Sequence, residues 1–502
     1  MPGTEMNYLT ASEMKDALAS RKVSAQELLE LHLDRVKALN PVYNAVVTLD
    51  EEGARQQARA ADEAIARGVG VGPLHGLPMT IKDSFAVTGM TATCGIEELR
   101  HYRPAQDAVA VERIRRAGAV IFGKTNLPAG AADHQSFNAL FGLTRNPWNV
   151  ERTVGGSSGG SAAALAAGLT PLELGSDIGG SIRVPAHFCG VYGHKPSYGL
   201  VSVEGHIPPP PGHVSEPELA VAGPLARSAA DLELLLDVVL GPPAFGPGGA
   251  GIELAPPRHH DLKAFRVAVW NDGAAYPLDS SYAAAIEALA ADLRRLGVPV
   301  DTAARPAIDP AQSHAVYLQT LFAIIGAGLP PPAREAIIAA GAGAPAESYA
   351  RRVSDAMQLT LPQYFALGEQ RQKLFRAWRD FFTGYDVLLC PITPTLAFPH
   401  DTARADMAAQ FDRRLKVDGA PIPYMDNLTW PGLITVANLP ATAMPTRHMV
   451  GGLPAGVQVV GPYLGDRTTL KFAQLLDEHL GGFTPPPISA RPDPDRSNRQ
   501  ST

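Results

Sequence analysis

The chain has 502 residues, of which 45% are hydrophobic and 19% are charged, a composition that excludes a disordered or fibrous protein. Its length allows one or two domains, because large α/β enzymes often fold around a single sheet. The formal net charge of −7 excludes the broad basic surface that binding to nucleic acid requires.

The chain opens with two predicted helices. Thr10 and Ser24 are each followed three residues later by a glutamate, the capping-box pattern of a helix N-terminus. The second helix is expected to end near residues 40–41, Asn-Pro. These patterns predict a helical N-terminal segment.

Helices and strands then alternate, which is typical of an α/β domain. The apolar strand that begins at Pro78 carries Lys82 into hydrophobic surroundings, an unusual place for a charge. The expected elements are a helix over 51–67, the strand from Pro78, a helix over 107–117 and a strand over 120–123, and the pattern continues to about Leu240.

The second half begins after a segment rich in proline and glycine, residues 241–263, which has the composition of a surface connection. We expect one domain over 1–485, with helices over about 311–383 covering a substrate pocket, and a disordered tail over 486–502. The other elements expected here are strands over 265–270, 387–390, 441–445 and 455–461, and helices over 282–296 and 468–480.

Residues 118–125, GAVIFGKT, match the phosphate-loop expression GxxxxGK[ST]. A phosphate loop follows a strand and opens a helix, whereas here a helix precedes and the four middle residues are apolar. We therefore interpret the segment as a strand, with Lys124 as a surface or packing residue.

The cysteines Cys94, Cys189 and Cys390 are widely separated and form no CxxC pair, so neither a disulfide framework nor a zinc site is expected. The fourteen histidines form no compact ligand set, and no metal or other cofactor is predicted. The N-terminus lacks a signal-peptide pattern, and no run of about 18 apolar residues occurs. We expect a soluble, cytoplasmic protein that does not bind membranes.

Two glycine-serine turns flank an alanine-rich helix. The first, residues 155–160 (GGSSGG), places Ser157 and Ser158 at the start of that helix. The second, residues 177–181 (DIGGS), offers consecutive backbone N–H groups beside the hydroxyl of Ser181, which is what a developing oxyanion needs next to its nucleophile. Both turns are expected to face one site.

The GGSSGG loop, followed at fixed spacing by the D-x-GGS-x-R turn, strongly resembles the amidase signature family. The resemblance extends from the N-terminal helices to Pro462. It implies a three-layer α/β/α fold with a large central mixed β-sheet surrounded by helices, and it allows a homodimer.

The resemblance also implies a catalytic triad. Ser181 would attack the carbonyl, Ser157, preceded by a cis peptide bond, would relay its proton, and Lys82 would accept that proton while neutral. An ordinary lysine has a pKa of about 10.4, so burial must lower this value by roughly three units. Without the serine loops, the better interpretation of Lys82 would be a structural ion pair with Asp83.

The family implies an oxyanion hole as well. Its donors would be the backbone N–H groups of Ile178, Gly179, Gly180 and Ser181. Ser158 is expected to support the site, and Asp177 and Arg183 to form a structural pair, although Arg183 could instead bind an anionic substrate. Position alone suggests four pocket residues, Phe137, Leu140, Phe141 and Ile207.

Three functions follow from the sequence. The first is an amidohydrolase for small or aryl amides, including carbamates (urethanes), acting through an acyl-enzyme. The alternative is the catalytic, glutaminase-type subunit of a tRNA-dependent amidotransferase, although residues 206–225 differ from that subunit's serine-rich pattern. The third is a non-catalytic amidase-like scaffold.

Overall fold

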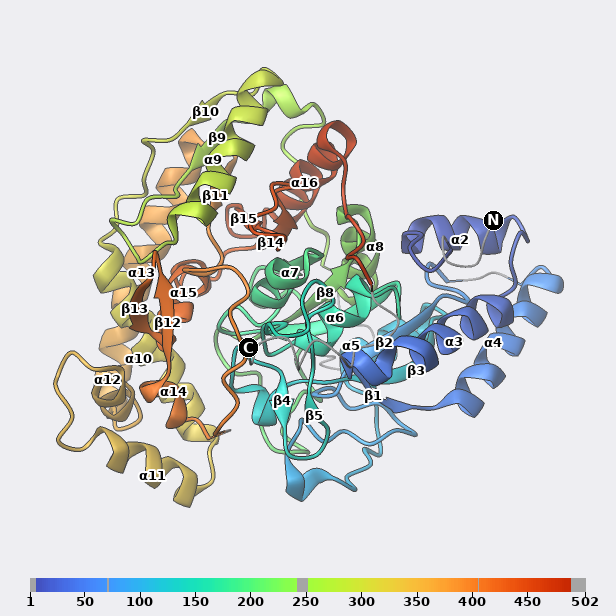
Figure 1. Ribbon diagram of the computed structural model, residues 1–502, viewed down its shortest axis with the longest axis horizontal. Helices are drawn as coiled ribbons and strands as arrows, with labels where there is room; N and C mark the ends of the chain where they lie inside the picture. Colours follow the sequence, from blue (N-terminus) through green and yellow to red (C-terminus); the bar gives the residue numbers. More distant parts are fainter. Residues whose placement is uncertain (1–5, 70–71, 242–251, 405, 489–502) are drawn as a thin grey trace, which may run out of the picture.

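The computed structural model describes residues 6–69, 72–241, 252–404 and 406–488. An eleven-stranded mixed sheet runs through it (Figure 1). In spatial order its strands are β1 (Val46–Leu49), β3 (Val120–Thr125), β2 (Pro78–Lys82), β6 (Leu172–Asp177), β8 (Val221–Ala226), β7 (Tyr192–Lys195), β14 (Ala441–Pro445), β15 (Gly456–Val460), β11 (Val387–Cys390), β9 (Val267–Val269) and β10 (Val300–Asp301).

Helices cover both faces of the sheet, which confirms the three-layer α/β/α arrangement. Helices α6 and α7 pack together against its central strands, and α5, α8 and α16 form a second packed group. The helices are α2 (Ala11–Ala19), α3 (Ala25–Tyr43), α4 (Glu51–Ala66), α5 (Val109–Arg116), α6 (Gly159–Ala166), α7 (Arg183–Cys189), α8 (Ala229–Val239), α9 (Ser280–Arg295), α10 (Pro310–Gly328), α11 (Pro331–Gly341), α12 (Tyr349–Ala356), α13 (Leu361–Gly384), α14 (Ala409–Asp412), α15 (Thr429–Thr435) and α16 (Asp466–Leu480).

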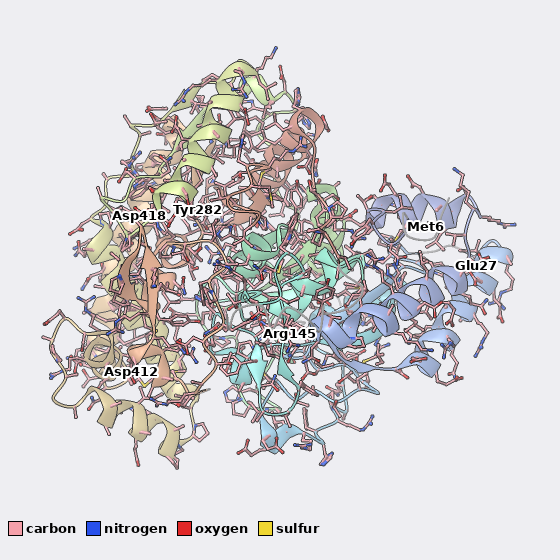
Figure 2. All side chains as sticks on the ribbon, in the orientation of Figure 1. Met6, Glu27, Arg145, Tyr282, Asp412 and Asp418 are labelled. Carbon is pink, nitrogen blue, oxygen red and sulfur yellow. The ribbon has the colours of Figure 1, made fainter. Side chains whose placement is uncertain are left out.

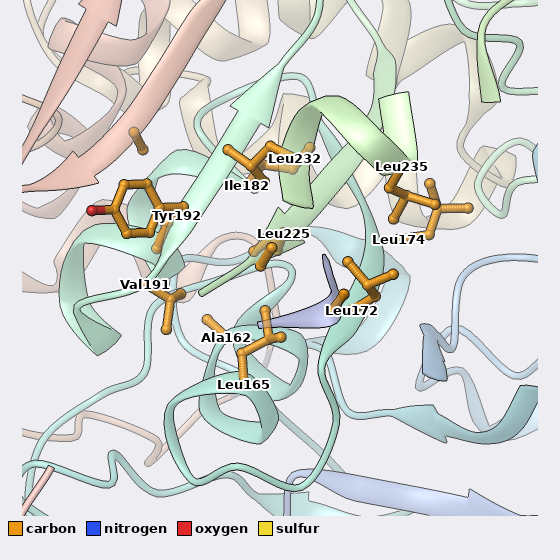
Figure 3. Packing of buried hydrophobic residues seen from close by; sticks show 14 of the residues in the cluster. Ala162, Leu165, Leu172, Leu174, Ile182, Val191, Tyr192, Leu225, Leu232 and Leu235 are labelled. Carbon is orange, nitrogen blue, oxygen red and sulfur yellow. The ribbon is translucent and has the colours of Figure 1, made fainter. Parts of the chain in front are cut away.

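The core lies between these layers. Figure 3 shows Leu165 of α6, Leu174 of β6 and Leu235 of α8 in one buried cluster around the sheet. All three side chains are fully buried. Burying a leucine side chain stabilises a fold by about 1.5–3 kcal/mol, so this packing fixes the position of α6, which follows the first serine loop, and of β6, which leads into the second.

The N-terminal helices begin as their sequence predicts. Thr10 and Ser24 each form a complete capping box. The predicted end of α3 is wrong by one turn, because Pro41 lies inside the helix and Asn44, in the left-handed conformation, ends it. A proline near the end of a helix removes only one hydrogen bond, and the tertiary packing of α3 outweighs that loss.

Residues from the second half of the chain form a helical region beside the sheet, α10 to α13, where the sequence predicts helices (Figure 1). A hairpin of β12 (Arg414–Val417) and β13 (Ala420–Pro423) lies next to it, and a smaller pair, β4 (Phe137–Asn138) and β5 (Gly142–Leu143), precedes the first serine loop. The hairpin turn is joined to α9, since Asp418, which is labelled in Figure 2, accepts hydrogen bonds from the N–H and hydroxyl of Ser280.

Candidate active site

Lys82 ends strand β2, and its side chain is fully buried. Its Nζ lies 2.7 Å from Ser157 Oγ and 2.9 Å from Ser176 Oγ. Burial lowers the pKa of Lys82 to about 7, although Cys94 and Asp177 act in the opposite direction. The amine is therefore in hydrogen-bonding contact with the first serine loop and has a pKa suited to a base at neutral pH.

The ion pair considered for Lys82 is made by another lysine. Asp83 pairs with Lys124, whose Nζ lies 3.0 Å from Asp83 Oδ1 and 2.9 Å from the Phe85 carbonyl. Lys124 belongs to strand β3, so the phosphate-loop pattern is indeed a strand, and the lysine is buried rather than on the surface. Because Lys124 neutralises Asp83, that carboxylate does not serve as the counter-ion of Lys82.

The two glycine-serine loops meet beside Lys82. The Gly156–Ser157 peptide bond is cis, and the Ser158 N–H donates to the Ser181 carbonyl at 3.0 Å. A Cβ at Gly156 would lie 2.3 Å from the Asp133 carbonyl oxygen, so only glycine fits there. Ser158 directly precedes α6, and its Oγ lies 3.3 Å from the Ser176 carbonyl oxygen.

The backbone before Ser181 is held in one orientation by its carbonyl groups. The Tyr317 hydroxyl donates to the Ile178 carbonyl at 3.0 Å, and His134 Nε2 donates to the Gly179 carbonyl at 3.0 Å. Burial lowers the pKa of His134, which favours the neutral imidazole. These contacts hold the Ile178 and Gly179 carbonyls, and with them the turn that leads to Ser181.

The structure corrects the predicted oxyanion hole at one position. The Gly180 N–H donates to Asp177 Oδ1 at 2.8 Å, so it is not free to bind a ligand. Within the described residues, the N–H groups of Ile178, Gly179 and Ser181 have no such acceptor. Asp177 accepts the Gly180 N–H because the tight turn brings this N–H back toward the carboxylate.

Asp177 and Arg183 form a fully buried ion pair, with Nη2–Oδ1 at 2.9 Å and Nε–Oδ2 at 3.0 Å. Burial by itself would raise the pKa of Asp177, but the Arg183 guanidinium holds it below its usual value. The remaining Arg183 donors reach Thr435 Oγ1 at 2.8 Å and Gln458 Oε1 at 2.9 Å. With its donors engaged, Arg183 has a structural place, and the anion-binding alternative loses its support.

A small cavity of about 70 Å³ opens next to Ser181. Its walls come from residues 131–134, from the turn at residues 178–181, from α10 and from residues 407–428. The apolar side chains that line it are Ile178, Leu321, Phe322, Ile325, Met407, Met425 and Leu428, and the polar ones include Asp133, His134, Gln410, Tyr424 and Asn427. Asp133 is itself paired with Arg413 at 2.5 Å.

The four residues that were predicted to line the pocket from their sequence position do not line the cavity beside Ser181. Phe137 packs near the Arg413 guanidinium, Phe141 lines a separate cavity beside α3, and Ile207 is buried in a cluster with Cys94. Leu140, half-buried before β5, does not line the Ser181 cavity either. Phe137, Leu140 and Phe141 belong to the β4–β5 hairpin and its turn, and although they precede the first serine loop in sequence, they do not line the cavity beside Ser181.

Four polar residues at the site were not singled out from the sequence. Ser176 and His206 contact the Lys82 side of the site, and His134 and Tyr317 hold the oxyanion loop. Ser176 directly precedes the DIGGS turn and could have been suspected for that reason. The other three come from distant segments, and no local pattern marks them.

The described residues contain no cluster of histidine, cysteine, aspartate or glutamate able to hold a metal ion. Over the same part of the chain, no helix combines the length and apolar character needed to cross a membrane. The three cysteines are free and buried.

The chain is similar to known proteins over most of its length. A family model described as Amidase matches residues 27–470. One of the subunits of the glutamyl-tRNA(Gln) amidotransferase from Synechococcus sp. (strain CC9605) is 33% identical, covering 96% of this chain and 98% of the relative. Among solved structures, one described as an amidase superposes with a TM-score of 0.76 at 31% identity, covering 94% of this chain and all (100%) of the other.

A second solved structure comes from a vestigial protein complex related to the evolutionary origins of an s-triazine catabolic enzyme. It has a TM-score of 0.78 and 29% identity, and the match covers 95% of this chain and 100% of the other. The chain belongs to the amidase signature family. The names of its curated relatives favour the amidotransferase alternative over a free-standing hydrolase.

Proposed function

We propose that the protein hydrolyses an amide-type C–N bond through Ser181, Ser157 and Lys82. The observation that carries the proposal is the buried Lys82 amine, with its pKa near 7, placed 2.7 Å from Ser157 Oγ in a loop that is bonded to Ser181. A neutral amine in this position is a base for a serine relay.

In the reaction, Ser181 Oγ attacks the carbonyl carbon while its proton passes to Ser157 Oγ and the Ser157 proton passes to Lys82. The N–H groups of Ile178, Gly179 and Ser181 stabilise the oxyanion. The leaving nitrogen takes a proton back through Ser157, the C–N bond breaks, and an acyl-enzyme remains. Water, deprotonated by the same relay, then releases the acid and restores Ser181.

The cavity beside Ser181 supports an uncharged amide or carbamate with an apolar portion, in agreement with the first of the predicted functions. Leu321, Phe322 and Met425 supply an apolar wall. The carboxylate on the opposite side, Asp133, is neutralised by Arg413 and bonded by Tyr424. A zwitterionic substrate would therefore find no free charge there to match its own.

Labelling with a fluorophosphonate tests the nucleophile. The intact protein should gain the mass of one phosphonyl group at Ser181, whereas Ser181→Ala should remain unlabelled because the reacting oxygen is gone. Ser158→Ala is the matched control and should still label. A wild type that does not react, or equal labelling of Ser181→Ala, would contradict the assignment and favour a non-catalytic scaffold.

A second candidate is the glutaminase subunit of a tRNA-dependent amidotransferase. It is favoured by the 33% identity to such a subunit over nearly the whole chain. Release of ammonia from glutamine, measured with and without the partner subunits and glutamyl-tRNA, separates the two. Glutamine turnover that depends on those partners would support the second candidate, and hydrolysis of an aryl amide or carbamate by the chain alone would support the first.

A further inference from the structure

His206 is bonded to Ser176, whose hydroxyl is the second one in contact with Lys82. It belongs to the connection between β7 and β8, within the segment HIPPPPG. Its backbone forms a bridge with Phe85, and its ring packs edge-on against the Phe85 ring with centroids 4.9 Å apart. The next N–H, that of Ile207, donates to the Ser84 carbonyl at 2.7 Å. Backbone contacts with residues 84–85 and the ring contact with Phe85 therefore hold the imidazole in place.

The hydrogen bonds of His206 define its tautomer. Nδ1 lies 3.0 Å from the Pro208 carbonyl oxygen, and because a carbonyl can only accept, Nδ1 carries the proton. Burial and the nearby Lys82 charge lower the pKa of His206 to about 3, so the ring is neutral in the working pH range. Nε2 is then an acceptor, and the Ser176 hydroxyl, 2.8 Å away, must donate to it.

The direction of the Ser176–His206 hydrogen bond determines the direction of the bond between Ser176 and Lys82. Since the only hydroxyl proton of Ser176 points to His206, Ser176 Oγ can only accept from Lys82 Nζ at 2.9 Å. A neutral lysine amine has two N–H groups and one lone pair. One N–H is directed to Ser176, and the lone pair remains available to the Ser157 hydroxyl at 2.7 Å.

We propose that His206 is a positioning residue that keeps the Lys82 lone pair available to Ser157, by drawing the Ser176 hydroxyl proton toward itself. The inference rests on the proposed function, in which Lys82 is the base. Without the His206 acceptor, the Ser176 hydroxyl is free to turn and donate to the lone pair of neutral Lys82. The Lys82 lone pair would then accept from Ser176 and would not be available to the Ser157 hydroxyl.

The electrostatic surroundings separate this role from a charge effect. The titratable groups that face Lys82 are Cys94, Glu173, Asp177 and His206. Burial raises the pKa of Cys94 to about 12 and that of Glu173 to about 8, so both are protonated at pH 7. Arg183 neutralises Asp177. Replacing a neutral His206 therefore alters hydrogen-bond direction and leaves the charge near the base unchanged.

The test compares His206→Phe with His206→Gln in steady-state assays on an aryl amide or carbamate ester. Phenylalanine keeps the contact with Phe85 but cannot accept, and we expect kcat to fall about tenfold with KM within about twofold, the cost of one misdirected hydrogen bond. Glutamine carries an oxygen that reaches the Nε2 position, and it should recover most of kcat.

The pH profile gives a readout that loss of packing would not move. A hydroxyl that donates to the neutral amine stabilises the unprotonated form and lowers the pKa of Lys82. The acidic limb of kcat/KM should therefore move to lower pH in His206→Phe, by about half a unit, and return in His206→Gln. A lower plateau with an unmoved limb would overturn the proposal.

A double-mutant cycle with Ser176→Ala completes the test. If His206 acts through the Ser176 hydroxyl, His206→Phe should cause no further loss of kcat in the Ser176→Ala background. Additive losses of kcat would overturn the inference. If His206→Phe does not fold, the comparison is made with Ser176→Ala and His206→Gln, which test the hydroxyl and the acceptor separately. Lys82→Met separates the two hypotheses. Full activity in that variant would overturn the proposed function, whereas an inactive Lys82→Met together with a fully active His206→Phe would overturn only the positioning role of His206.

Discussion

At the scale of single residues, the site is organised by the burial of one amine. Lys82 is an ordinary lysine by sequence, and only its enclosure at the end of β2 brings its pKa to about 7. The neighbouring Lys124 is equally buried but retains a carboxylate partner. Two lysines on adjacent strands therefore differ in chemistry because one has a counter-ion and the other has serine hydroxyls.

The pH dependence of the reaction follows from this difference. The base must be unprotonated, so kcat/KM should rise with pH through the Lys82 pKa and be half-maximal near pH 7. Lys82→Met should lower kcat by about 10²–10⁴-fold, because the proton relay loses its acceptor. Wild-type turnover by Lys82→Met at neutral pH, or a flat profile between pH 5 and about 8, would contradict the assignment.

At the scale of elements, the parts of the site that sequence could predict are those carried by local turns. The GGSSGG and DIGGS loops and the strand before Lys82 have short-range patterns, and the structure brings all three together. The cavity walls have no such pattern, since α10 and residues 407–428 are brought to Ser181 by packing. Phe137 and Phe141 are near the first serine loop in sequence, but they do not line the cavity as predicted.

The turn before Ser181 should be intolerant of side chains. Gly180 has φ +103°, and a Cβ there would lie 2.9 Å from Pro431 Cγ and from Val184 Cγ2. Gly180→Ala must shift the turn, and we expect kcat to fall about 10²-fold, as for a misplacement of roughly 1 Å. Gly199→Ala is the matched control, with φ +87° and open space. Its activity should be unchanged, and equal effects of the two substitutions would refute the steric argument.

At the scale of the whole molecule, one side chain joins distant parts of the chain. Arg183 connects the Asp177 carboxylate at the end of β6 with Thr435 in α15 and Gln458 in β15. The nucleophile turn is thus bonded to the C-terminal half of the sheet. That the chain forms a single domain over 1–485 remains a prediction, and this buried connection supports it.

Removal of Arg183 should therefore destabilise the whole fold. Arg183→Leu leaves the buried Asp177 carboxylate without its partner, a change that costs about 3–5 kcal/mol in the free energy of unfolding. Asp177 has a lowered pKa, so the loss should be largest above about pH 4, the ordinary aspartate range, and should shrink as acid protonates the carboxylate in both proteins. Urea denaturation at pH 7 and at acid pH measures both effects.

The control for this measurement is an ion pair of similar length on the surface. Arg351 and Asp355 approach to 2.8 Å on α12, but both side chains are well exposed, with 44% and 57% of their area accessible. Arg351→Leu should change the free energy of unfolding by less than about 0.5 kcal/mol, because water screens exposed pairs. If Arg183→Leu costs no more than Arg351→Leu, Arg183 does not hold the two halves of the sheet together, and its donors become available for a substrate anion.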